Sequence, residues 1–110
     1  MPLLYHLVEP DHWKKYMDKD RYVSAGFQEE GFIHLSLREQ IDGVLERFYA
    51  DASELLVLVV PEKPVRKQLK YEPGGDVDEL FPHLYQGIPI EAIEDIQMLK
   101  RNKQGTWEWV

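Results

Sequence analysis

Three histidines, His6, His34 and His83, lie inside apolar, strand-like stretches of the sequence, each near an aromatic side chain. An imidazole can hydrogen-bond a nucleotide, bind a metal or carry protons between reactants near neutral pH. It can also sit in a core as a structural residue when both ring nitrogens have partners. Strands from distant parts of a chain often meet at one sheet face. The hypothesis that gives these histidines a joint catalytic role is that they converge on one pocket.

Four further side chains are candidate ligand-binding residues. Tyr5 and Tyr85 can stack on a base or nicotinamide, although aromatic side chains at strand spacing are more often part of a core. Arg47 can reach a phosphate from a helix, or be solvated or ion-paired. Ser36 precedes a helix, where it can cap the helix and help to hold an anion.

The segment from Glu30 to Gln40 must position His34. Strand alternation places Phe32, His34 and Ser36 on one face and the intervening aliphatic residues on the other. Ser36 followed by Glu39 matches a capping box and predicts that a helix begins at the serine.

Hydrophobic periodicity predicts the remaining elements. The run 55–60 is typical of a central strand, and Pro82 indicates an edge strand or loop for 81–85, because proline cannot donate to a ladder. Other expected strands are 3–8, 68–72, 96–100 and 107–109, and expected helices are a short one after Pro10 and an amphipathic one over 37–48. The order predicts an α+β fold with a curved, mixed or antiparallel sheet and two or three helices.

Composition narrows the class of protein. With 110 residues, of which 44% are hydrophobic and 30% charged, we expect one compact domain over 1–110. A net charge of −7 argues against nucleic acid as a partner, except as a substrate. The chain has no cysteine, so thiolate chemistry is excluded. We also expect no signal peptide, no membrane partner and a cytoplasmic location.

Three ordered motifs resemble a bacterial family over nearly the whole chain. They are Leu4-Tyr5-His6, the segment from Glu30 to Ser36 with Gln40 and Arg47-Phe48-Tyr49, and the run from Phe81 to Tyr85. The family is the one known as domain of unknown function 952.

That family in turn resembles the ADP-ribosyltransferase fold, which implies a nucleotide cleft for which NAD is the expected cofactor. The resemblance implies that His6 orients a ribose and that His34 contacts a ribose or phosphate, with His83 and Tyr85 completing the pocket. The third motif of these transferases contains a glutamate that has no clear match in this chain. By sequence order the nearest carboxylates are Glu72 and Glu91.

The leading hypothesis is an ADP-ribosyl- or phosphotransferase-like domain. The alternatives are a non-catalytic nucleotide- or small-molecule-sensing module and a three-histidine metal site. The spacing favours the metal site least, because none of the three has a histidine or cysteine at helical spacing.

Overall fold

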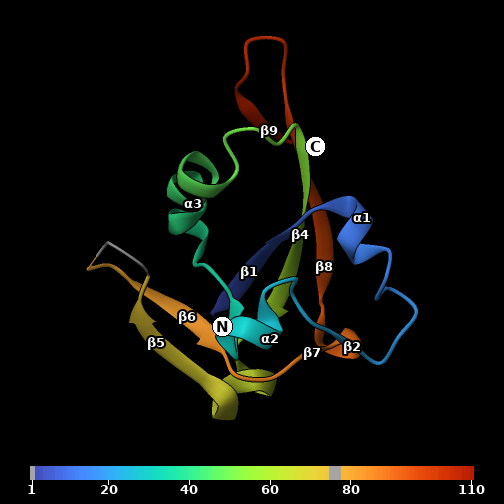
Figure 1. Cartoon of the computed structure of the whole chain (residues 1–110), viewed down its shortest axis with the longest axis vertical. Coiled ribbons are helices and arrows are strands. Elements are labelled where there is room, and N and C mark those ends of the chain that lie inside the picture. Colours follow the sequence, from blue (N-terminus) through green and yellow to red (C-terminus); the bar gives the residue numbers. More distant parts are fainter. Residues whose placement is uncertain (1, 75–77) are drawn as a thin grey trace.

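The largest sheet has four antiparallel strands in the order β1-β4-β8-β9. The strands are β1 (Leu3–Val8), β4 (Glu54–Pro61), β8 (Asp95–Arg101) and β9 (Trp107–Trp109). They belong to a computed structural model that describes residues 2–74 and 78–110. The hairpin of β8 and β9 extends beyond the rest of the molecule at one end (Figure 1). The predictions of a central strand over 55–60 and of strands over 96–100 and 107–109 are confirmed, and the last two strands pair as a hairpin.

Two smaller antiparallel sheets complete the strand structure of the described residues. One pairs β2 (Arg21–Tyr22) with β7 (Ile88–Pro89). The other has the order β3-β6-β5, with β3 (Ile33–His34), β6 (Leu80–Leu84) and β5 (Leu69–Pro73). The expected curved sheet is therefore divided into three separate sheets.

The helices of the described residues are short, and α3 (Ile41–Phe48) faces the sheet β3-β6-β5 (Figure 1). The 3₁₀ turn η1 (Arg38–Gln40) directly precedes α3. The others are α1 (Pro10–Trp13), α2 (Phe27–Glu30), η2 (Lys63–Gln68) and η3 (Ile90–Ala92).

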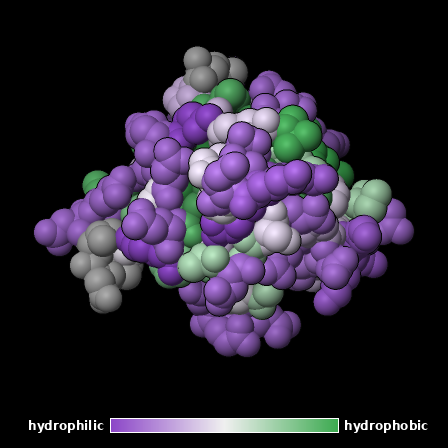
Figure 2. Space-filling model, turned by 90° about the horizontal axis from the view of Figure 1, so that it is seen from above, coloured by the Kyte–Doolittle hydropathy of each residue, from purple (hydrophilic) through white to green (hydrophobic). Residues whose placement is uncertain are grey.

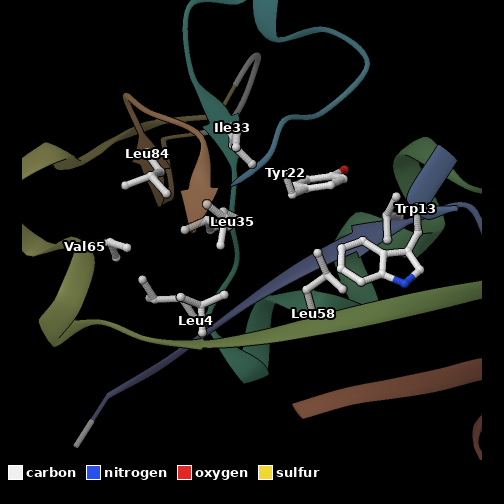
Figure 3. Packing of buried hydrophobic residues seen from close by; sticks show 11 residues of the cluster. Leu4, Trp13, Tyr22, Ile33, Leu35, Leu58, Val65 and Leu84 are labelled. Atoms are coloured by element: carbon white, nitrogen blue, oxygen red, sulfur yellow. The ribbon is translucent and has the colours of Figure 1, made fainter. Parts of the chain in front are cut away.

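Apolar side chains are buried on both faces of the four-stranded sheet, because successive residues of β1 and β4 point to opposite sides. Cluster 1 lies on one face and includes Leu4, Leu58 and Trp13 (Figure 3). Cluster 2 lies on the other face, where Ile41 and Leu45 of α3 pack against the sheet. Its remaining buried members are Leu7, Leu55, Val57 and Leu99.

The prediction that residues 81–85 form an edge strand or loop is wrong, because β6 is the central strand of its sheet. Pro82 lies opposite Leu35, one residue beyond the end of β3, and its carbonyl still accepts a hydrogen bond from the Leu35 amide at 3.0 Å. The missing donor of the proline therefore falls where the ladder with β3 ends, and costs the sheet little.

The capping box predicted at Ser36 and Glu39 is also wrong. Ser36 instead pairs with Tyr5 of β1 through two backbone hydrogen bonds of 2.8 Å. The side-chain oxygen of Gln40 accepts from the Leu37 amide at 2.9 Å, so the reciprocal half of a capping box is present one residue later. Because Ser36 is held in a β-bridge, the helical turn begins after it.

The prediction of a small α+β fold with mostly antiparallel strands is confirmed. In the described part of the chain, no helix has the length and apolar character needed to cross a membrane. Seen from above, the surface is mostly hydrophilic, with hydrophobic residues in small groups (Figure 2). The likeness to ADP-ribosyltransferases and the cytoplasmic location stay predictions.

Candidate functional site

A cleft of about 580 Å³ is lined by residues of β1, α3 and β6 and by the segment around β3. In the ribbon, α3 lies across from β6 with β1 beside both (Figure 1). A cleft of this volume is in the usual range for small-molecule sites. Its aromatic walls come from three segments and include Phe32, Phe48 and Phe81. The cleft therefore combines flat apolar surfaces with the polar side chains described below.

The hypothesis that the three histidines converge is confirmed, because His6, His34 and His83 all line this cleft. The antiparallel register of β3 and β6 places His34 directly opposite His83, with their rings 5.1 Å apart at the centroids. The adjacent pair, Ile33 and Leu84, faces cluster 1 instead. Strand alternation thus separates a core face from a cleft face, as the sequence predicts.

His6 has both ring nitrogens occupied by protein groups. Nδ1 donates to the carbonyl of His34 at 2.7 Å, and Nε2 accepts from the Tyr22 hydroxyl at 2.7 Å. Burial lowers the pKa of His6 to about 4, although its hydrogen bond to the His34 carbonyl acts in the opposite direction. Burial also raises the pKa of the Tyr22 hydroxyl. His6 is therefore a neutral group that holds β1, β2 and β3 together at the base of the cleft, with no nitrogen left for a ligand.

His34 is the accessible histidine of the cleft, with about half of its side chain exposed. Its Nε2 donates to Glu30 Oε2 at 2.9 Å. Glu30 ends α2, and Gly31 then adopts a left-handed φ of 82°, which lets the chain turn directly into β3. This turn brings the carboxylate of Glu30 back over the imidazole.

His83 is 4% exposed and has a carboxylate partner on the neighbouring strand. Its Nδ1 donates to Glu72 Oε1 at 2.8 Å, and the Tyr85 hydroxyl donates to the same oxygen at 2.5 Å. The Tyr85 hydroxyl and then His83 lower the pKa of Glu72, while the carboxylate raises the pKa of Tyr85. The other nitrogen, Nε2, is buried and has no hydrogen-bond partner among the described residues.

The candidate ligand-binding residues fall into two groups. Ser36 and Arg47 line the cleft, and Arg47 takes part in no ion pair among residues 2–74 and 78–110. Tyr5 does not line the cleft, and its side chain packs against cluster 2. Tyr85 contacts the site indirectly, through Glu72 and through its ring 5.2 Å from that of Phe32.

Sequence reasoning missed the carboxylate partners of two histidines. Glu30 lies four residues before His34, a separation that could have indicated the contact if a helical turn had been expected there. Glu72 and His83 are 11 residues apart, and only the register of β5 and β6 brings them together. Glu91, the other carboxylate considered, does not line the cleft.

A metal site built from all three histidines finds no support in this geometry. The described residues contain no group of three histidine, aspartate or glutamate side chains arranged to hold a metal ion. The ring nitrogens of His6 are also both used within the protein. A histidine that binds a metal needs an unprotonated ring nitrogen that is not already used within the protein.

Comparison with known families and structures agrees with this architecture. A profile described as "Protein of unknown function (DUF952)" matches residues 7–96. The chain belongs to this family. No match was found among curated proteins.

The crystal structure of protein CC0527 from Caulobacter crescentus is similar to this DUF952 chain, with 26% identity and a TM-score of 0.84, covering 96% of this chain and 93% of that one. The solution NMR structure of CC0527 gives 27% identity and a TM-score of 0.81, with 96% and 90% coverage. These similarities support the fold of the whole domain.

The cleft of this DUF952 domain presents three polar groups of different character. Arg47 offers a cationic donor, His34 an imidazole supported by a carboxylate, and His83 a buried nitrogen without a hydrogen-bond partner among the described residues. Such groups can bind an anion and can accept or deliver a proton.

Proposed function

We propose that the cleft binds an anionic ligand of nucleotide size. The observation that carries this proposal is Arg47, whose guanidinium lines the cleft without an ion pair among the described residues. Its one side-chain hydrogen bond there is a long one, 3.3 Å to the Gly43 carbonyl on its own helix. A guanidinium with free donors matches the geometry of a phosphate. In a chain of net charge −7, this local cation favours an anion in the cleft.

Aromatic side chains beside Arg47 supply surfaces for a planar group. The guanidinium carbon lies 5.4 Å from the ring centroid of Phe48 and 5.5 Å from that of Phe81. Phe32 lies on the same sheet wall of the cleft as Phe81, near both His34 and His83. A ligand with a phosphate and a flat ring would use both features, because aromatic rings stack on bases and arginine binds phosphates.

Within this ligand class we propose NAD as the first compound to test, because the motifs around His6 and His34 resemble those of ADP-ribosyltransferases. In this proposal His34 contacts a ribose or phosphate, and His6 acts by holding the His34 backbone in place. A transferase would release nicotinamide from NAD. A sensing module would bind the nucleotide and leave it intact.

The test measures binding of NAD, ADP-ribose and AMP by calorimetry and by thermal shift. A ligand that binds only the folded protein raises the melting temperature as its concentration exceeds Kd. We expect the Arg47→Gln variant to bind at least tenfold more weakly, since a hydrogen bond to a charged group contributes about 1.5 to 3 kcal/mol. The matched control is Arg66→Gln, because Arg66 of η2 pairs with Glu62, which precedes this helix, and does not line the cleft.

Equal binding by wild type and Arg47→Gln would contradict the proposal, as would the absence of binding by all three nucleotides to folded protein. An assay for nicotinamide release then separates the two forms of the proposal. Release by wild type supports a transferase, and binding without release supports a sensing module.

A further inference from the structure

The two ring nitrogens of His83 have different surroundings. Nδ1 faces Glu72 at 2.8 Å, whereas Nε2 is buried without a partner in the described part of the chain. Buried polar atoms in folded proteins are nearly always hydrogen-bonded, so an exception at the wall of a cleft indicates a position that a ligand can complete. His83 is only 4% exposed, so this nitrogen lies within the wall of the cleft and is not a solvated surface group.

Glu72 determines which nitrogen of His83 carries the proton. The Tyr85 hydroxyl donates to the same carboxylate oxygen and, with His83, lowers the pKa of Glu72, so the carboxylate is ionised and acts as an acceptor. An ionised carboxylate can only accept, and Nδ1 must therefore donate. In a neutral imidazole the other nitrogen then has a free lone pair and acts as an acceptor.

The neighbours of Nε2 cannot supply the missing donor. The ring of Phe32 stacks on His83 with centroids 4.2 Å apart and an interplanar angle of 18°. The ring of His34 meets His83 edge-on, and the Nε2 of His34 is directed to Glu30. The described residues therefore give Nε2 no donor, and a ligand group that reaches this nitrogen must bring its own.

Arg47 indicates what else that ligand carries. Its guanidinium lies over the ring of Phe81, which shares the cleft face of β6 with His83 two residues further along. Two residues of a strand span about 7 Å. An anionic group at Arg47 and a donor at His83 are thus separated by a distance that one small molecule can bridge.

We propose that His83 Nε2 accepts a hydrogen bond from a hydroxyl group of the ligand, so that the cleft selects hydroxyl-bearing phosphates, such as ribonucleotides and sugar phosphates, over plain anions. This inference rests on the proposed function, because it assigns a second contact to the ligand that Arg47 binds. Glu72 is a positioning residue in this arrangement. It sets the tautomer of His83 and does not touch the ligand.

The first test compares the binding of AMP, 2′,3′-dideoxy-AMP and inorganic phosphate to the full chain. We expect AMP to bind wild type about tenfold or more tightly than the dideoxy compound, because the analogue leaves the buried acceptor unpaired. In His83→Phe, which keeps a flat ring against Phe32 and lacks the acceptor, the two compounds should bind equally. Equal binding to wild type overturns the hydroxyl contact while the proposed anion site stands. If none of the three phosphates binds, both proposals fall.

The second test needs no ligand and covers the case in which His83→Phe does not fold. Nitrogen-15 NMR of the histidine rings reports which nitrogen carries the proton. We expect an unprotonated Nε2 for His83 in wild type, and loss of this preference in Glu72→Ala. Glu30→Ala is the matched control, because it removes the carboxylate of His34 and should leave the His83 signals unchanged. If the neutral imidazole of His83 in wild type carries its proton on Nε2, the inference is overturned.

Discussion

At the scale of single residues, His6 and His83 show that the same residue type can take opposite roles in one cleft. Both nitrogens of His6 are hydrogen-bonded, whereas one nitrogen of His83 has no partner within residues 2–74 and 78–110. The structural role considered for each histidine therefore describes His6, and the ligand-binding role stays a proposal for His34 and His83. The two roles differ in whether other residues offer hydrogen-bond partners to the ring nitrogens. Those partners come from distant parts of the chain, so a local stretch of sequence does not reveal them.

The pH dependence of stability should reflect the neutral state of His6. Its pKa is about 4 in the folded protein and 6.5 in the unfolded reference. Between these values the unfolded chain binds a proton that the folded protein does not, so unfolding becomes easier as the pH falls from 6.5 toward 4. At full extent this difference of about 2.5 pKa units corresponds to roughly 3 kcal/mol of the free energy of unfolding.

Urea unfolding of wild type and His6→Gln at pH 7, 6 and 5 checks this prediction. The variant should be less stable at pH 7, because the Tyr22 hydroxyl and the His34 carbonyl lose a partner of the right shape. It should also lose less stability on acidification than wild type. Carboxylates titrate in both proteins, so the difference between the two curves isolates His6. Parallel curves would show that His6 is not the group responsible.

At the scale of elements, the strands with clear periodicity were predictable and the pairing between them was not. The apolar run in β4 and the alternation from Phe32 to Ser36 depend only on neighbouring residues. The central place of β6 depends on where β3 ends, which makes Pro82 harmless. A rule about proline in isolation could not include that context.

The same limit applies to the candidate site. The three histidines, Arg47 and Ser36 were found from residue type and local pattern, and all line the cleft. Tyr5 was assigned by motif, but its side chain packs against cluster 2 and does not line the cleft. Glu72 lies beside His83 only because β5 and β6 pair in one particular register, and register is set by tertiary packing.

Arg101 of β8 should be important for joining the four-stranded sheet to the chain that follows α3. Its guanidinium donates to four backbone carbonyls: Ala52 at 2.6 Å, Gly105 at 2.8 Å, Ala50 at 2.9 Å and Tyr49 at 3.0 Å. We expect Arg101→Lys to lower the free energy of unfolding by about 1 to 3 kcal/mol, because an ammonium cannot reproduce this planar fork of donors. Chemical denaturation measures the change.

The matched control is Lys100→Gln, because Lys100 precedes Arg101 on the same strand. Its one ion pair in the described part of the chain is at 3.9 Å to Glu54, with about half of each side chain exposed. Its free energy of unfolding should change by less than about 1 kcal/mol. Similar losses in the two variants would mean that the carbonyl contacts of Arg101 contribute nothing beyond its charge.

At the scale of the whole molecule, the four-stranded sheet connects two apolar clusters, and the cleft depends on both. Cluster 1 holds the core face of β3 and β6, through Ile33 and Leu84. Cluster 2 holds α3, which carries Arg47 on the other wall. Because β1 and β4 contribute to both clusters, loosening one cluster should destabilise the other. We therefore expect the domain to unfold in a single cooperative step.

Two substitutions on α3 test this expectation. Leu45 is 3% exposed and belongs to cluster 2, so Leu45→Ala should cost about 2 to 5 kcal/mol of unfolding free energy. Phe48 is 67% exposed on the same helix, and Phe48→Ala should cost less than about 1 kcal/mol. Far-ultraviolet circular dichroism and tryptophan fluorescence should give coincident transitions in both variants, because Trp13 packs in cluster 1 and Trp107 against cluster 2. If fluorescence of Leu45→Ala showed a first step that left Trp13 buried, the two clusters would be independent. The walls of the cleft would then not be rigidly coupled.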